Sequence, residues 1–170
     1  LNLPAKEKMK PAAYRDIPAA KIPLASLDGD TRVKVIAGKL GHTLGPIHGG
    51  STDPYYFDVY LAAGAVLEPA LPAGHNAFLY VYEGEALVGE ERKPLARRSA
   101  GLLSSGAESV RIEAGGEGAR LLLLAARPIG EPVVQYGPFV MNTREEIEQA
   151  IADYQSGALS REAIGSIKIA

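Results

Sequence analysis

The three histidines, His42, His48 and His75, are the residues of this sequence whose type best suits metal chemistry. A non-haem iron or zinc site needs two or three His side chains and a carboxylate on a rigid scaffold. His42 and His48 stand six positions apart in a glycine-rich stretch, and His75 directly follows a glycine. Six positions apart in a glycine-rich loop is not a ligand spacing of any regular element, and His75 is expected in a turn. These positions favour solvent-exposed loop histidines over a shared metal site.

Asp58 is the second candidate, because it stands between Tyr56 and Tyr60 in the alternating stretch YYFDVYLA. Side chains two positions apart share one face of a strand, so these three would lie together. Such a face lines either a pocket or the solvent. We favour the solvated face, with Phe57 directed inward.

Weaker motifs are found further along the chain. Glu83 and Glu85 flank a glycine and have the types of paired catalytic carboxylates, although acids at strand ends are usually solvated. The run Gly115-Gly-Glu-Gly118 lacks the Lys-Ser/Thr of a phosphate-binding loop, so we expect a hairpin turn there. Ser104 and Ser105 lack the G-x-S-x-G context of a hydrolase nucleophile.

Length, composition and charge exclude several classes of protein function. With 170 residues we expect one domain, and the absence of Cys excludes disulfides, thiolate metal sites and a cysteine nucleophile. A net charge of −2 argues against direct binding to nucleic acid or an anionic membrane. No stretch reaches the ~20 apolar residues of a membrane span, and the N-terminus lacks a signal peptide. We therefore expect a cytoplasmic protein. Because the sequence begins at Leu1, we also expect it to be processed or part of a longer chain.

Many short strands are predicted before a single helix. The 19 Gly and 12 Pro punctuate alternating apolar stretches in the way typical of a sandwich, jelly roll or barrel. A long loop is expected over 38–54. The predicted strands are 14–17, 32–37, 55–62, 64–68, 77–83 with its continuation 85–88, 102–103, 109–113, 120–125, 133–134 and 139–141.

A capping box predicts the helix. Thr143 and Glu146 have the required spacing, an apolar stripe follows from Ile147 to Tyr154, and Gly157 suits a left-handed cap. The predicted organisation is an extended arm or linker over 1–13, a barrel over 14–142, the helix within 143–157, and a tail over 158–170. We expect one more helical turn over 160–165.

Four stretches resemble the C-terminal half of the pirin family. They are NLPAKEKM at 2–9, YRDIPAAKIP at 14–23, NAFLYVYEGEALVG at 76–89 and EPVVQYGPFVMNTREEIEQAIADYQSG at 131–157. The resemblance implies an all-β fold with a single cupin-type, jelly-roll-like barrel and one C-terminal helix. Pirins are bicupins whose first barrel carries a metal, usually iron, held by three His and one Glu. Some bacterial members are quercetin dioxygenases, and the animal protein is a nuclear transcription cofactor.

The cupin metal motif can be compared position by position with this sequence. Counting back from the strand Leu79–Glu85, the expected Glu position falls on Asn76, and two His positions fall near Ala70 and Pro72. The stretch 101–112, which should supply another His, contains none. The resemblance therefore implies a barrel with no metal ligand, no cofactor and no catalytic residue of its own.

Two functions follow from this resemblance. The first is a structural or interaction domain that supports a metal-bearing N-terminal barrel. The alternative is half of a quercetin dioxygenase-like, metal-dependent oxidoreductase whose iron site lies in that N-terminal barrel. In both, this chain alone is not expected to be an enzyme.

An apolar cluster near the end of the chain is the candidate interface. It comprises Tyr136, Phe139, Met141, Ile147 and Ile151. The cluster either packs on its own barrel or docks on a partner. The partner would be the N-terminal barrel of a longer protein or, in a homodimer, a second copy of this chain.

Overall fold

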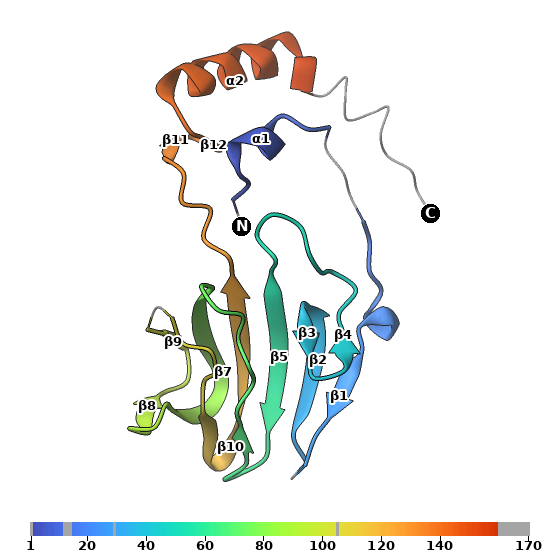
Figure 1. Ribbon diagram of the computed structural model, residues 1–170, viewed down its shortest axis with the longest axis vertical. Helices are drawn as coiled ribbons and strands as arrows, with labels where there is room; N and C mark the ends of the chain where they lie inside the picture. Colours follow the sequence, from blue (N-terminus) through green and yellow to red (C-terminus); the bar gives the residue numbers. More distant parts are fainter. Residues whose placement is uncertain (1, 12–14, 29, 105, 160–170) are drawn as a thin grey trace. The chain divides into compact units, whose positions relative to one another are not determined.

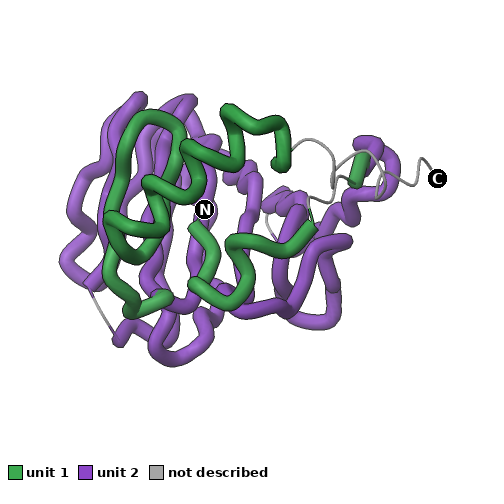
Figure 2. Tube along the Cα trace, turned by 90° about the horizontal axis from the view of Figure 1, so that it is seen from above, with its two compact units in different colours: residues 1–16, 129–170 green, residues 17–128 purple. Residues whose placement is uncertain are grey.

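The computed structural model describes residues 2–11, 15–28, 30–104 and 106–159 (Figure 1). By its internal contacts the chain divides into two compact units (Figure 2). Ile17–Pro128 form one, here called the sheet unit. Leu1–Asp16 and Ile129–Ala170 form the other, called the terminal unit. The division of the sequence into arm, barrel, helix and tail stays a prediction.

The regular elements of the sheet unit are antiparallel strands and one short 3-10 helix, η1. Its main sheet has the order β1-β2-β5-β10-β7-β8, with β6 paired to β10 and β9 paired to β7 (Figure 1). A separate hairpin joins β3 to β4. The elements are η1 (Ala19–Lys21), β1 (Leu24–Ser26), β2 (Arg32–Ala37), β3 (Lys39–Leu40), β4 (Thr43–Leu44), β5 (Tyr55–Leu61), β6 (Val66–Leu67), β7 (Asn76–Val88), β8 (Lys93–Leu95), β9 (Ser99–Leu102) and β10 (Ile112–Ala126).

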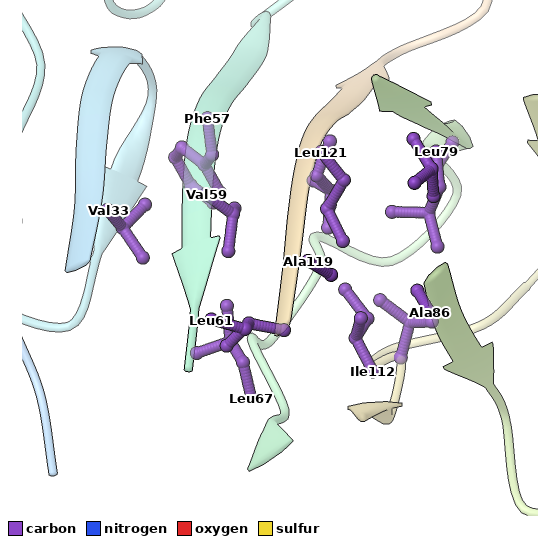
Figure 3. Packing of buried hydrophobic residues seen from close by; sticks show 14 of the residues in the cluster. Val33, Phe57, Val59, Leu61, Leu67, Leu79, Ala86, Ile112, Ala119 and Leu121 are labelled. Atoms are coloured by element: carbon purple, nitrogen blue, oxygen red, sulfur yellow. The ribbon is translucent and has the colours of Figure 1, made fainter. Parts of the chain in front are cut away.

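The core follows from strict alternation along the central strands. In β5 every second side chain is fully buried, namely Phe57, Val59 and Leu61. They pack with Val33 of β2 and Leu121 of β10 (Figure 3). Each such side chain contributes roughly 1.5–3 kcal/mol by leaving water. The alternation thus fixes which face of each strand remains available for chemistry.

Two long strands, β7 and β10, pair with each other along most of their lengths and bend together. Gly84 and Gly118 adopt φ values of 69° and 83°, in the left-handed region. A Cβ on Gly84 would overlap the Gly118 carbonyl oxygen, so the two backbones can meet only without side chains. The ladder shifts register between Ala114 and Ala119 beside this point. The glycines therefore allow β7 and β10 to bend without ending the strands.

This crossing corrects one prediction. The run Gly115-Gly-Glu-Gly118 is not a hairpin turn but the interior of β10. The predicted strand 120–125 and the last two residues of the predicted strand 109–113 belong to that single strand, which begins at Ile112. Glycines in the sequence mark a bulge as well as they mark a turn, and only the pairing with β7 decides between them.

Smaller differences concern the N-terminal third. The expected loop over 38–54 contains the hairpin β3–β4, and the expected arm over 1–13 contains a single helical turn, α1 (Ala5–Lys8). In the predicted strand 14–17, the described residues 15–17 have no regular structure. Residues 160–165, predicted as a helical turn, lie outside the described residues.

Glu131 holds the terminal unit together. Its Oε2 accepts hydrogen bonds from the Ala5 amide at 2.7 Å and from Asn142 Nδ2 at 2.8 Å. Lys8 Nζ donates to the Val140 carbonyl at 3.0 Å. The N-terminal segment is thereby joined to the hairpin of β11 (Val134–Tyr136) and β12 (Phe139–Met141).

The helix α2 (Arg144–Ser156) completes this unit and confirms the predicted helix. The Glu146 amide donates to Thr143 Oγ1 at 3.2 Å, and Glu146 Oε2 accepts from the Thr143 amide at 3.0 Å. Gly157 forms the left-handed cap at φ 75°. Across the described residues, no helix is both long and apolar enough to cross a membrane.

Replacing Gly84 by Ala tests the crossing of β7 and β10. Gly84→Ala is expected to lower the free energy of unfolding by about 2–4 kcal/mol, because the new methyl meets the Gly118 carbonyl and the left-handed φ is strained. Urea denaturation measures the change. Gly116→Ala is the matched control in β10, since no atom lies within 4 Å of its Cβ position. It should change stability by less than about 0.5 kcal/mol, and equal losses in both variants would contradict the crossing.

Candidate functional site

The structure separates the three histidines into two kinds. His42 and His48 are exposed, and His48 Nδ1 lies 3.0 Å from the Gly45 carbonyl oxygen. His75 is buried instead, with its side chain only 2% exposed. Its Nε2 lies 3.8 Å from Asp53 Oδ2, and its ring lies 5.8 Å from that of Tyr55. The expectation of an exposed loop histidine is therefore wrong for His75.

The reason lies in the parity of β7. Ala77, Leu79 and Val81 are its inward residues, and His75 has the same parity one step before the strand begins. The preceding glycine obscured this signal in the sequence. Within the described part of the chain, neither ring nitrogen of His75 has a hydrogen-bond partner.

The positions that would hold a cupin metal do not fit one here. Ala70 and Pro72 offer no side-chain donor atom, and Asn76 is exposed at the start of β7. Among the described residues, no group of three or more His, Asp and Glu side chains is arranged to hold a metal ion. These positions therefore provide no set of ligands for a metal that could catalyse a hydrolytic or redox reaction.

Asp58 lies on the face of β5 opposite the core, whereas Phe57 is buried as predicted. Its carboxylate is not simply solvated. The Tyr82 hydroxyl donates to Asp58 Oδ1 at 2.6 Å, and Lys34 Nζ lies 3.7 Å from Oδ2. The side chain of Asp58 is 26% exposed. Tyr82, from β7, is the partner that the sequence analysis missed, because β10 lies between the two strands in the sheet.

Two phenols of the sheet unit have perturbed acidity. Burial raises the pKa of Tyr82, and the hydrogen bond and negative charge of Asp58 raise it further. Burial also raises the pKa of Tyr55, and the charge of Asp53 adds to this shift. Both groups therefore remain protonated at neutral pH. Tyr82 consequently acts as a hydrogen-bond donor to Asp58.

The weaker candidates form no site. Glu83 pairs with Arg120 at 3.5 Å and is 60% exposed, and Glu85 is exposed. Ser104 is exposed, and Ser105 lies outside the described residues.

The residues of the candidate interface cluster differ in how far they are exposed to solvent. Tyr136 is 67% exposed, whereas Met141 and Ile147 are buried and Ile151 is half-buried. Phe139 packs its ring 6.1 Å from that of Tyr154, which is itself 69% exposed. Most of the exposed surface near this cluster therefore belongs to Tyr136 and Tyr154, with smaller parts from Phe139 and Ile151.

Comparison with known proteins agrees with this architecture. The Pirin C-terminal cupin domain family matches residues 56–160. A Pseudomonas aeruginosa protein named "Putative quercetin 2,3-dioxygenase PA3240" is 47% identical over 94% of this chain and 57% of its own length. A pirin-like protein of Caulobacter vibrioides is 45% identical over 92% of this chain and 56% of its own length.

A solved structure extends the likeness to three dimensions. The crystal structure of quercetin 2,3-dioxygenase from Acinetobacter baumannii superimposes with a TM-score of 0.83 and 31% identity, covering 94% of this chain and 55% of that one. The all-β cupin-type fold predicted from the sequence is confirmed. This chain belongs to the pirin family and corresponds to its C-terminal cupin domain. It spans about half the length of the curated relatives that it matches.

Removing the Tyr82 hydroxyl tests the pair on the outer face of the sheet. Tyr82→Phe is expected to lower the free energy of unfolding by about 1–2 kcal/mol at neutral pH, because Asp58 loses a charge-assisted hydrogen bond. Tyr80→Phe is the control on the same strand and face, since its hydroxyl makes no hydrogen bond to a described residue. Urea denaturation should show less than about 0.5 kcal/mol for the control.

The pH dependence of this difference gives a second readout. A raised pKa in the folded state stabilises the protein below the ordinary tyrosine pKa of about 10, and this contribution is lost as the pH rises further. The gap between the wild type and Tyr82→Phe should therefore be constant at neutral pH and shrink in alkali. A gap that widens above pH 10 would contradict this assignment.

Proposed function

We propose that this chain is a cupin barrel without a metal of its own, which docks to and supports an iron-bearing N-terminal cupin barrel. One observation carries the proposal. The positions expected to hold the metal, near Ala70, Pro72 and Asn76, provide a single exposed amide in place of His and Glu ligands. The chain covers only 57% and 56% of the length of the Pseudomonas aeruginosa and Caulobacter vibrioides relatives, which leaves room in them for such a barrel.

A second candidate is one half of a quercetin dioxygenase-like oxidoreductase. The names of the Pseudomonas aeruginosa relative and of the Acinetobacter baumannii structure favour this reading. In this alternative the reaction takes place at iron in the N-terminal barrel, and the present chain shapes or stabilises that neighbour. Both candidates assign the same role to this chain taken alone.

The docking surface that we propose is the exposed part of the terminal unit. Tyr136 on β11 and Tyr154 on α2 present apolar surface, and both neighbour Phe139: Tyr136 is its partner in the hairpin, and the Tyr154 ring packs against its ring. Met141 on β12 and Ile147 on α2 are buried and are therefore not part of the exposed surface. Exposed aromatic side chains of this kind are common anchors of protein interfaces. In the absence of the N-terminal barrel, we expect a second copy of the chain to cover them.

Metal loading tests the first part of the proposal. The full chain is incubated anaerobically with Fe(II), dialysed and subjected to elemental analysis. We expect well below one iron per chain, because among the described residues no histidine belongs to a group of three or more potential ligands. The same preparation should not turn over quercetin above a protein-free blank.

His75→Ala and His42→Ala are the matched variants for this experiment. One is buried beside Asp53 and the other is exposed, so a true site at His75 would distinguish them. One iron per chain that is lost only in His75→Ala would refute the metal-free barrel. Quercetin turnover that scales with the chain would do the same.

Sedimentation velocity tests the docking surface. We expect the chain alone to form a dimer that Tyr136→Asp converts to a monomer, because the new carboxylate would have to be buried against apolar surface. The affinity should fall by at least about tenfold, as for an interface anchor.

The control is Leu44→Asp, which places the same charge at an exposed apolar residue of the sheet unit. It should leave the dimer intact. A wild-type chain that stays monomeric at high concentration, or a dimer equally weakened by both variants, would count against this surface.

A further inference from the structure

A basic groove lies on the face of the main sheet opposite the core. Its cavity volume is about 260 Å³. Four neighbouring strands, β2, β5, β10 and β7, supply most of its wall, and β1 closes one side. The lining residues are Leu24, Arg32, Lys34, Asp58, Tyr60, Tyr82 and Arg120. None of them is involved in the proposed docking surface or in the expected metal positions.

Strand register brings two arginines to one tyrosine. Tyr60 of β5 is paired with Arg32 of β2 on one side and with Arg120 of β10 on the other. The Arg32 guanidinium carbon lies 4.5 Å from the centre of the Tyr60 ring, and that of Arg120 lies 5.4 Å from it. Both cations are therefore gathered around a single ring on a rigid sheet.

The charges in this groove do not balance. Three cations line it, against the one carboxylate of Asp58, which is already engaged by Lys34 and the Tyr82 hydroxyl. Arg120 reaches Glu83 outside the lining at 3.5 Å. Arg32 forms no hydrogen bond or ion pair with any described residue, so its contact with Tyr60 is its only electrostatic partner there. The groove thus carries uncompensated positive charge.

An anion would relieve this imbalance. A guanidinium offers a planar fork of donors that matches the two oxygens of a carboxylate or phosphate. Stacking on Tyr60 holds both guanidinium groups in place before a ligand arrives, which lowers the entropy lost on binding. Asp58, tied to Tyr82 and Lys34, is held back from pairing with Arg32.

We propose that the basic groove binds the oxyanion group of a small ligand, a carboxylate or a phosphate, with Arg32 and Arg120 as its principal donors. This site is independent of the proposed metal-free role and would exist even if that proposal failed. The volume is that of a site for a small anion.

Titration of the full chain with inorganic phosphate and, separately, with succinate tests the proposal by amide NMR. Chloride at matched ionic strength controls for salt. We expect saturable shifts in β2, β5 and β10 with at least one oxyanion and not with chloride. Response to phosphate alone, to succinate alone or to both supports the site and identifies which group it accepts.

Arg32→Gln should weaken this binding by about tenfold or more, since a charge-assisted bidentate contact is lost. Arg120→Gln serves as a second variant, and the dispersion of the amide spectrum reports whether each remains folded. Arg127→Gln is the matched control, because it removes the same charge from an exposed arginine outside the groove. Absence of saturable binding, or equal weakening by Arg32→Gln and Arg127→Gln, overturns the proposal.

Discussion

The close approach of two glycine backbones is the constraint on which the sheet unit depends. Gly84 and Gly118 let β7 and β10 bend at the same place while their ladder continues on both sides. Because the two strands pair almost throughout, β10 can pair with β5 along one part and with β6 along the other. Leu121 and Ile112, one from each part, then belong to one apolar cluster. The bend therefore lets β7 and β10 contribute to both parts of the core.

The core also determines which side chains become neighbours on the outer face of the sheet. Once the inward residues are fixed, the alternate residues of each strand must face away from the core, and the register decides which of them become neighbours. Arg32, Tyr60 and Arg120 meet because three ladders align them, although no two of them are near in the sequence. A one-residue slip of β5 would bury Tyr60 and expose Val59, so the core protects the arrangement of the groove.

Local patterns made part of this architecture predictable. The capping box from Thr143 to Glu146 is a contact between neighbours in the sequence, so the helix could be predicted together with its ends. The alternation in β5 likewise identified Phe57 as inward. Interactions across strands could not be found in this way. Tyr82 binds Asp58 over an intervening strand, and His75 is buried by a parity that its glycine neighbour disguised. The cupin fold was predicted from the family resemblance. The strand pattern by itself did not distinguish a sandwich from a jelly roll or a barrel.

The contact between Ala5 and Glu131 has a consequence for the order of assembly. The two residues are 126 positions apart in the chain, whereas the sheet unit is one continuous segment, Ile17–Pro128. During synthesis on the ribosome every strand of the sheet unit therefore emerges before the carboxylate that ties down the N-terminal segment. The segment around Ala5 is made before the sheet unit but finds its partner only after that unit has been made, and Lys8 must wait even longer, for the carbonyl of Val140.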